Sequence, residues 1–399
     1  MSPTTICLAG KNDVAVDALL YMIERGWKDQ LVVCPNRSDS GSSTWQPSLV
    51  RFAREFGVPV VALEAAEQIQ DVLFISLEFD RIIRPSSFSS RRLYNFHFSA
   101  LPAYKGMYTS AHPILQRETR SGVTLHEIDR GIDTGRIIDQ VVFDLLPDWT
   151  ARDLYFAYME NTKSLFRKRI DYILSPDAIV AVEQSSIGSS YYSRDSLHYG
   201  DISIRLNDTA EGIVRQLRAF SFREYQTPQV AGVPIGGWTI TSRRSKTGPG
   251  TVVWGGPTAL TVSTIDYDLE LTIDRQMEWF RVTTESSDYE LDALVPGAID
   301  TRDAKGWTPL IRAAYRGDAG LCRILLQRGA NPNTANMNGT TPIMYAYSGL
   351  DRARGIRTAQ ELRRFGADSS LKDRFGKSLH DYHHDVLPSI ECDQGADLT

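Results

Sequence analysis

The sequence has few cysteines and no long apolar run. Its four cysteines, at positions 7, 34, 322 and 392 of 399 residues, show no CxxC spacing. This pattern is typical of neither a disulfide framework nor a zinc site, so we expect a reducing compartment and no metal. No stretch of about 18 apolar residues exists, and no basic segment precedes an apolar run at the start. We therefore expect a cytoplasmic protein that is neither exported nor membrane-spanning.

Positive charge is also in short supply. The chain carries 44 Lys and Arg against 49 Asp and Glu, a net charge of −5, without long basic runs. A polyanion such as DNA or tRNA needs a basic footprint, so we expect no nucleic-acid partner. The polar run at residues 380–385 has a metal-like composition, but terminal clusters of this kind are usually solvated. Hydrophobic residues make up 42% of the chain, enough for two or three packed domains.

Short β-rich runs alternate with helical patterns in the first half of the chain. The β-rich runs are residues 5–10, 30–34, 58–63 and 72–77, with helical patterns at 14–25 and 47–56 and a longer one at 149–174. This order predicts an α/β fold, with a parallel-rich sheet covered by helices on both faces. In such sheets ligands bind beyond the carboxyl ends of the strands.

The second part of the chain changes character after a Ser/Tyr-rich connection at residues 175–201. One helix is expected at 208–220, followed by β-rich runs near 230–240, 250–254, 259–265, 269–273 and 279–282. We expect three domains: a catalytic domain at 1–200, a small β-rich domain at 201–295 and a third domain at 296–399. Open β-edges in the second domain predict a homodimer formed through it.

The last hundred residues contain an internal repeat. The sequence GWTPL at residues 306–310 returns 33 residues later as GTTPI, and more loosely at residues 376–380. The period and this opening are similar to the ankyrin repeat, which predicts an all-α array. The third unit is offset by 37 residues, so about four residues are inserted near 351–357. Because few units are visible, we expect the array to pack on the second domain.

Polar side chains gather in the segment YNFHFSALPAYKG at residues 94–106. If residues 92–98 form a strand, Asn95 and His97 project to the same face, because they are two residues apart. Asp133 follows in the sequence GIDTG at 131–135, after a second expected strand at 123–128. A turn there is able to direct its carboxylate to the same place. Taken singly, each residue is more often a cap, a satisfied core group or a turn residue.

This segment resembles the motif N-x-H-x-S-x-L-P-x-Y-x-G of the folate-dependent formyltransferases, whose D-T-G follows at the same separation of 38 residues. The resemblance extends over about residues 1–235. It implies a Rossmann-like core and N10-formyltetrahydrofolate as formyl donor. By this resemblance Asn95 donates to the developing oxyanion, His97 acts as general base or oxyanion partner, and Asp133 orients the imidazole.

The resemblance also implies binding residues. The pterin ring is held mainly by backbone groups of the loops near residues 77–83 and 127–131. The residues proposed for folate are Leu77, Phe79, Arg81, Ile82, Ile83 and Asp129. Simple core packing is the alternative for the two isoleucines. The residues proposed for the second substrate are Lys11, Asn12, Lys105, Met107, Tyr108, Thr109, Arg218 and Tyr225. By the resemblance, Lys11, Asn12 and Lys105 are candidates for a pyrophosphate or sugar, and Arg218 and Tyr225 for a nucleotide. Solvated surface charge is the alternative for both lysines.

The nucleotide-sugar branch of the family fits best, because the tRNA branch needs a basic surface. The expected substrate is dTDP-3-amino-3,6-dideoxy-D-glucose, for O-antigen and lipopolysaccharide sugars. The alternatives are dTDP-4-amino-4,6-dideoxyglucose, or a non-enzymatic ankyrin interaction protein with a degenerate formyltransferase module. Trp307 stands at the variable position of an ankyrin finger. Its ring is available to stack on the base of a second nucleotide-sugar or to cover the adjoining domain.

Overall fold

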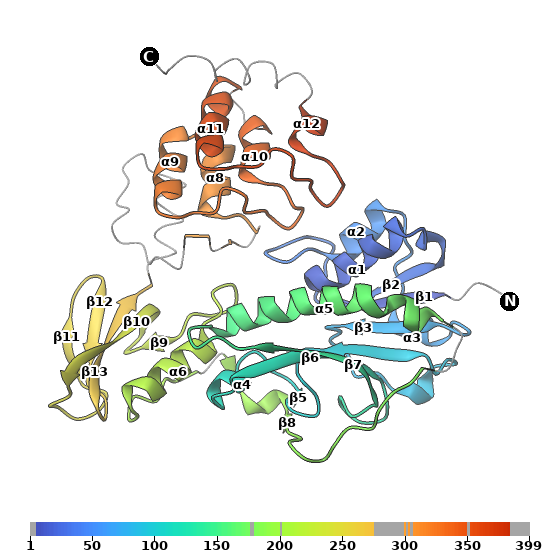
Figure 1. The fold of residues 1–399 in the computed structure, drawn as a ribbon, viewed down its shortest axis with the longest axis horizontal. Helices are drawn as coiled ribbons and strands as arrows, with labels where there is room; N and C mark the ends of the chain where they lie inside the picture. The colour runs from blue at the N-terminus through green and yellow to red at the C-terminus, as the bar shows by residue number, and fades with distance from the viewer. Residues whose placement is uncertain are drawn as a thin grey trace.

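The computed structural model describes residues 5–175, 179–199, 202–274, 299–300, 302–303, 306–348 and 352–383. A sheet with covering helices, a smaller sheet at one end and a helical array above them make up the molecule (Figure 1). Both predicted domain boundaries and the predicted β-rich run at 279–282 lie outside the described residues.

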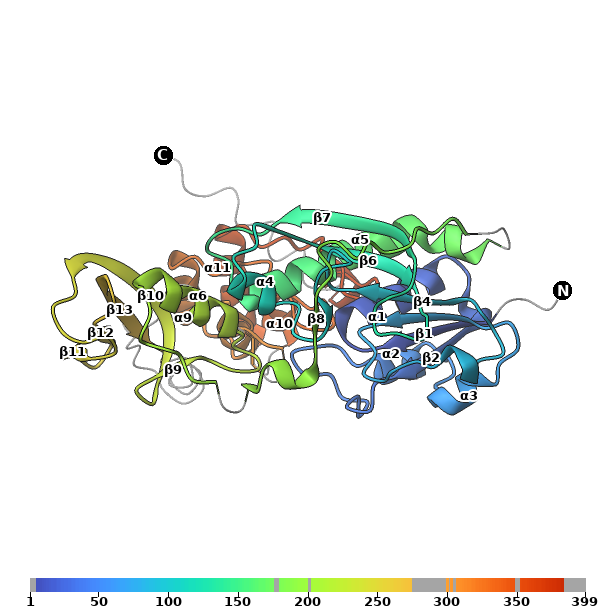
Figure 2. The same ribbon diagram turned by 90° about the horizontal axis from the view of Figure 1, so that it is seen from below.

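The first sheet has the strand order β2-β1-β3-β4-β6-β7. Its strands are β1 (Ile6–Gly10), β2 (Leu31–Pro35), β3 (Leu73–Leu77), β4 (Leu93–His97), β6 (Arg120–Glu127) and β7 (Ile137–Asp144). The first four are mutually parallel. Strand β6 runs antiparallel to both of its neighbours, β4 and β7. Figure 2 shows these strands fanned from β7 to β2. The predicted parallel-rich sheet is confirmed, whereas β7 was not predicted.

Helices cover both faces of this sheet. They are α1 (Asn12–Glu24), α2 (Leu49–Glu55), α3 (Leu63–Glu67), α4 (His112–Leu115) and α5 (Ala151–Leu174), with short 3-10 turns at Lys28–Gln30, Pro85–Ser87 and Arg194–Ser196. In β1, Ile6 and Leu8 pack with α1, α2 and α5, while Cys7 and Ala9 face the α3 side. This alternation follows from the two-residue period of a strand.

The strand expected at residues 58–63 does not form. Only an isolated bridge joins Val60 to Val33, and α3 already begins at Leu63. Pro59 has no N–H to offer a ladder, and Val60 is 39% exposed at the edge beside β2. The apolar run therefore lacks the backbone hydrogen bonds and the burial that a strand would need.

The second sheet is antiparallel and has the order β11-β12-β13-β10-β9. Its strands are β9 (Gln229–Val230), β10 (Val233–Arg244), β11 (Val252–Gly255), β12 (Ala259–Val262) and β13 (Tyr267–Ile273), preceded by helix α6 (Ala210–Phe220). The predicted β-rich region is confirmed. A separate parallel pair joins β5 (Lys105–Gly106) to β8 (Tyr191–Tyr192).

The array consists of helix pairs, as the repeat predicted. Its helices are α8 (Pro309–Tyr315), α9 (Ala319–Gln327), α10 (Pro342–Ser348), α11 (Arg352–Arg364) and α12 (Leu379–Tyr382). The repeated Thr-Pro starts a helix because Thr308 Oγ1 accepts from the Ile311 N–H at 3.2 Å and Pro309 occupies the first turn. The described part of α11 has 13 residues against nine in α9, so inserted residues lengthen a helix.

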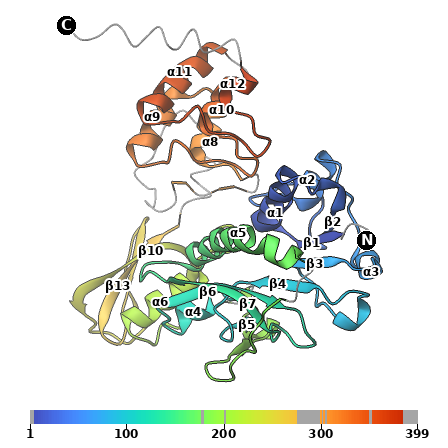
Figure 3. The same ribbon diagram turned by 45° about the vertical axis from the view of Figure 1, so that its right-hand side comes forward.

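The array packs on the first domain, and the expectation that it packs on the β-rich domain is wrong. Phe375 stacks on Phe52 of α2 with ring centroids 5.5 Å apart, and Arg374 pairs with Asp13 of α1. In Figure 3 the array lies above α5, with α1 and α2 beside its lower end. At α1 and α2 the Phe375 ring has an aromatic partner and the Arg374 charge has an acidic one. Across the described ranges, no helix is long and apolar enough to cross a bilayer.

Candidate active site

The structure brings Asn95, His97 and Asp133 together. Asn95 and His97 lie in β4 and point to one face, and Asp133 lies in the turn between β6 and β7. Asn95 Nδ2 is 3.2 Å from Asp133 Oδ1, and His97 Nδ1 is 3.5 Å from Asp133 Oδ2. The residues that the motif singled out therefore form one contiguous polar cluster.

The turn that carries Asp133 is held by main-chain contacts. Asp133 itself has a positive φ of 55°, and a Cβ on Gly135 would lie 1.8 Å from the Glu127 carbonyl oxygen. Gln184 Nε2 donates to the Asp133 and Gly135 carbonyls, both at 2.8 Å. The glycine lets the turn approach β6, and Gln184, which sequence reasoning missed, fixes its outer side.

Asp133 is a buried carboxylate that stays ionised. Its Oδ2 accepts the Gly106 N–H at 2.9 Å, and its side chain is only 12% exposed. Burial alone would raise the pKa of Asp133, but the His97 and His126 imidazoles and the Gly106 N–H outweigh it and lower that pKa well below its usual range. The site therefore holds a fixed negative charge beside His97.

The orientation of His97 is set by a carbonyl that the sequence did not indicate. His97 Nε2 lies 2.9 Å from the Tyr104 carbonyl oxygen, which only accepts hydrogen bonds. Nε2 therefore carries a hydrogen, and Nδ1 is the nitrogen that faces Asp133. The 3.5 Å between Nδ1 and Oδ2 is too long for a good direct hydrogen bond. Nδ1 is thus available to exchange a proton with a third group.

A second histidine, His126, belongs to the cluster and was also missed. Its Nδ1 is 2.7 Å from the Glu127 carbonyl, so in the neutral ring Nε2 accepts from Asn95 Nδ2 at 3.1 Å. The amide nitrogen of Asn95 also lies 3.2 Å from Asp133 Oδ1, so it is held between His126 and Asp133.

The residues predicted for folate split into buried and exposed ones. Leu77 is fully buried and Ile83 is 8% exposed, whereas Ile82 is 73% exposed. Arg81 lies over the Phe79 ring, 4.9 Å from its centroid. Core packing therefore describes Ile83 but not Ile82, whose apolar side chain is presented at the surface.

The two loops predicted to hold the pterin border one hydrophobic cluster. Phe79, Ile83 and Ile128 all belong to it. Asp129 shapes the second loop, because its Oδ1 accepts from the Gly131 N–H at 3.0 Å. An apolar cluster with backbone turns on either side fits a flat heteroaromatic ring, and the assignment of these residues to folate stays a prediction.

The candidates Lys105, Met107, Tyr108 and Thr109 follow the catalytic strand closely. The Lys105 ammonium and the Tyr108 hydroxyl donate to the segment 189–194 at 3.0 and 2.9 Å. Met107 is 45% exposed, and Thr109 is half-buried. This stretch therefore extends from the polar cluster toward the surface and is hydrogen-bonded to the segment 189–194.

The segment after β1 is tied to the end of β3. Asn12 is 3% exposed, and its Nδ2 donates to Glu78 Oε2 at 2.7 Å and to the Tyr155 hydroxyl at 2.6 Å. Glu78 stands level with His97, one residue beyond the paired end of the two strands. Among the described residues no hydrogen bond or ion pair involves the half-buried Lys11 ammonium. Glu78 and Tyr155 were not singled out from the sequence.

The two candidates for the nucleotide differ in exposure. Arg218 is 9% exposed, and its Nε donates to the Trp149 carbonyl at 2.9 Å. Tyr225 is 54% exposed and packs edge-on against Trp45 and Phe222, with centroids 5.2 and 4.7 Å away. Tyr225 therefore presents an aromatic surface, whereas Arg218 is engaged inside the protein.

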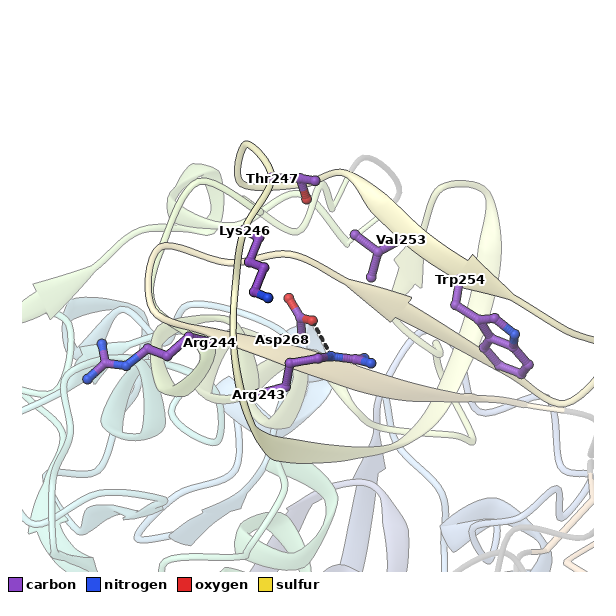
Figure 4. A pocket seen from close by; sticks show the side chains of 7 residues that line it. All are labelled: Arg243, Arg244, Lys246, Thr247, Val253, Trp254 and Asp268. Carbon is purple, nitrogen blue, oxygen red and sulfur yellow. Dashed lines mark hydrogen bonds and ion pairs between the residues drawn. The ribbon is translucent and has the colours of Figure 1, made fainter.

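A shallow pocket on the second sheet lies elsewhere (Figure 4). It is lined by Arg243, Arg244, Lys246, Thr247, Val253, Trp254 and Asp268. None of the predicted site residues lines it. Within the described ranges, no group of three His, Cys, Asp or Glu side chains is arranged to hold a metal ion.

Two family profiles match the chain. The family described as Formyl transferase matches residues 62–170, and Ankyrin repeats (3 copies) matches residues 287–373. Methionyl-tRNA formyltransferase of Burkholderia vietnamiensis is 26% identical over 282 residues, which cover 65% of this chain and 85% of that protein.

Two solved structures are more similar in sequence. The N-formyltransferase of Helicobacter canadensis, solved with folinic acid and dTDP-3-aminofucose, is 40% identical with a TM-score of 0.62, covering 68% of this chain and 100% of that one. WlaRD, a sugar 3N-formyl transferase solved with dTDP and 5-N-formyl-THF, is 39% identical with a TM-score of 0.63, covering 69% and 99%. With this similarity and the Asn95, His97 and Asp133 cluster in place, the chain belongs to the formyltransferase family and is an N-formyltransferase.

Proposed function

We propose that the protein transfers a formyl group from N10-formyltetrahydrofolate to the amine of a dTDP-linked amino-dideoxy sugar, with dTDP-3-amino-3,6-dideoxy-D-glucose as its substrate. The observation that carries this proposal is the complete catalytic cluster in a chain 40% identical to an enzyme solved with folinic acid and dTDP-3-aminofucose. The sugar would serve O-antigen and lipopolysaccharide synthesis. Because folate carriers and nucleotide sugars are made in the cytoplasm, we place the reaction there.

The chemistry that we propose uses the available groups of the cluster. The folate donor supplies an activated formyl carbon, and the sugar amine forms the new C–N bond to it. The amide N–H of Asn95 donates to the oxygen that becomes negative as the bond forms. His97 Nδ1 takes the proton that the amine loses, and the fixed charge of Asp133 stabilises the resulting imidazolium. The bond from the formyl carbon to the folate nitrogen then breaks, and that nitrogen regains a proton.

A position of the amine on carbon 3 is supported by both solved relatives, one named a sugar 3N-formyl transferase and one holding a 3-amino sugar. Methionyl-tRNA is the rival acceptor, because curated relatives carry that activity at 26% identity. The net charge of −5 opposes it, since tRNA phosphates need a basic surface. The exposed ring of Tyr225 and the unpaired Lys11 ammonium suit a base and a pyrophosphate.

We propose a homodimer formed through the second domain, residues 201–295. The edge strand β11 is exposed along its whole length, with Val252, Val253 and Trp254 at 42, 40 and 54% exposure. In Figure 4, Val253 and Trp254 of this strand line one side of the pocket. An exposed apolar edge offers unpaired backbone groups as well as side chains, so a second copy suits it.

We also propose a second nucleotide-sugar site on the ankyrin unit at Trp307. Trp307 is half-buried and meets the rings of Tyr315 and Tyr345, with centroids 5.2 and 4.7 Å away. Tyr315 is 38% exposed, and Asn336 fixes the Tyr345 hydroxyl at 2.7 Å. The Trp307 ring packs on tyrosines of its own array, and these rings form an aromatic surface suited to a base.

The substrate proposal is tested by incubating the enzyme with N10-formyltetrahydrofolate and single acceptors. We expect dTDP-3-amino-3,6-dideoxy-D-glucose to gain the mass of one formyl group. The 4-amino isomer should react at least about 10²-fold more slowly, because its nucleophile is displaced by one ring carbon. The galacto epimer and methionyl-tRNA complete the panel. Faster formylation of methionyl-tRNA or of the 4-amino sugar would contradict the proposal.

His97→Ala and Asp133→Asn should each lower kcat by about 10² or more, because proton transfer and imidazolium stabilisation are lost. Steady-state rates with saturating folate measure this. His198→Ala and Asp71→Asn, at exposed positions, are the matched controls and should stay near the wild-type rate. Unfolding temperatures show whether each variant is folded. A folded His97→Ala enzyme within a few-fold of wild type would remove His97 from the mechanism.

The dimer proposal predicts a mass of twice 44.7 kDa in light scattering at micromolar concentration. Val253→Lys should shift the mass toward the monomer, because an edge lysine disfavours strand pairing. Val180→Lys, at a residue 75% exposed and outside both sheets, is the control. A wild-type protein that scatters as a monomer would refute the interface.

The accessory-site proposal predicts two binding events per subunit in calorimetry with the amino-sugar nucleotide. Trp307→Ala should remove one event and alter the substrate dependence of the rate, because base stacking is lost. Phe365→Ala, an exposed aromatic of the same array, should keep both events. One event per wild-type subunit would leave the repeat without this role.

A further inference from the structure

The loop at residues 373–377, which we call the finger, is a part of the array that contacts the catalytic domain. It is braced internally, because Asp373 Oδ1 accepts the Phe375 and Lys377 N–H groups, each at 2.9 Å. The Arg374 N–H also donates to the Asn338 carbonyl at 2.8 Å. A loop fixed by its own backbone presents its two outward side chains, Arg374 and Phe375, in a defined geometry.

Phe375 packs against two aromatic side chains, Phe52 in α2 and Phe56 directly after it. Its ring stacks on Phe52 with an interplanar angle of 5° and on Phe56 with an angle of 15°, at centroid distances of 5.5 and 6.2 Å. Phe52 is fully buried. The aromatic contact sets where the finger sits and places the next side chain over the start of α1.

Arg374 pairs there with Asp13 in the first turn of α1. Its side chain is 22% exposed and that of Asp13 is 19% exposed, so both charges are largely removed from water. Lys163 of α5 pairs with the other oxygen of the same carboxylate. Asp13 is thus held from two sides, once by its own domain and once by the array.

Asp13 directly follows Lys11 and Asn12, the residues predicted to hold the sugar or pyrophosphate. Asn12 has a positive φ of 66° and donates to Glu78 and Tyr155. Glu78 follows the β3–β4 pair directly, in register with His97 of the neighbouring strand. Through the adjacent Asn12, Asp13 is therefore connected to the end of β3, next to the strand that carries His97.

We propose that the finger is a positioning element of the active site, in which Arg374 acts through Asp13 to fix the Lys11–Asn12 turn for the nucleotide-sugar. Arg374 is a positioning residue here and touches no reacting atom. The inference rests on the proposed sugar-nucleotide substrate. The sequence agrees with it, because the two residues before the repeated glycine are Arg-Phe in the third unit but Ala-Lys and Met-Asn in the others.

Arg374→Ala should raise KM for the amino-sugar nucleotide about tenfold and leave KM for the folate donor within twofold, because only the sugar-side turn loosens. Arg374→Lys keeps the charge and should restore most of the effect. Arg364→Ala is the matched control, because Arg364 is 71% exposed and pairs within the array. A folded Arg374→Ala enzyme with unchanged KM values would overturn the proposal and leave the finger a structural anchor.

Asp13→Asn provides the second route if Arg374→Ala folds poorly. The double variant Asp13→Asn, Arg374→Ala should be no worse than Asp13→Asn alone, because that single change already removes the ion pair with Arg374. Additive losses would contradict a path through Asp13.

Hydrogen exchange without any substrate gives an independent test. The backbone amides of residues 10–14 should exchange faster in Arg374→Ala than in Arg364→Ala. Equal exchange in the two variants would also overturn the proposal. Failure of the substrate proposal would instead show in the wild type, which would then formylate no amino-sugar nucleotide.

Discussion

The buried carboxylate of Asp133 is the constraint on which the active site depends. A charge with 12% of its side chain exposed is tolerated in a protein interior only when it is paired and hydrogen-bonded. Its hydrogen-bond donors are Asn95 Nδ2 from β4 and the Gly106 N–H from β5, and the rings of His97 from β4 and His126 from β6 lie 3.5 and 3.6 Å from its oxygens. The same contacts that stabilise the charge bring Asn95, His97 and Asp133 together, so the geometry of the candidate site follows from satisfying one carboxylate.

The change of strand direction within the sheet makes this arrangement possible. The turn after β6 begins beside the start of β4, where the Ile128 N–H donates to the Leu93 carbonyl at 2.9 Å. To reach Asn95 and His97, Asp133 must come back across the face of the sheet. Its own positive φ and the contact of Gly135 with the Glu127 carbonyl allow that return. The Asp-Thr-Gly motif is therefore a backbone requirement as much as a chemical one.

The sequence was most informative where side-chain identity and spacing carry the function. Asn95, His97 and Asp133 were found because their types and separations match a motif, and the repeat period predicted the array. Tyr104 was missed because its carbonyl binds His97, and any residue type supplies a carbonyl. Gln184 lies 51 residues from Asp133 in a segment without periodicity, so nothing local marks it.

The fold was predictable to a similar depth. Alternating strands and helices predicted the parallel part of the sheet and the β-rich second sheet. The β7 strand was missed because its residues are mostly half-exposed, which weakens the apolar pattern. The strand expected near Val60 failed because its run is exposed at an edge.

The array's packing partner could not be predicted, because it is decided by contacts between residues far apart in the chain. Arg374 and Asp13 are separated by most of the sequence, and each looks like an ordinary surface charge by itself. Their pairing accompanies the stacking of Phe375 on Phe52, an aromatic contact between the same two parts of the chain. A repeat that adds no reacting group is thereby joined to the turn next to the predicted substrate residues. The position of that junction, on α1 and α2 instead of the second sheet, is what connects the array to the chemistry.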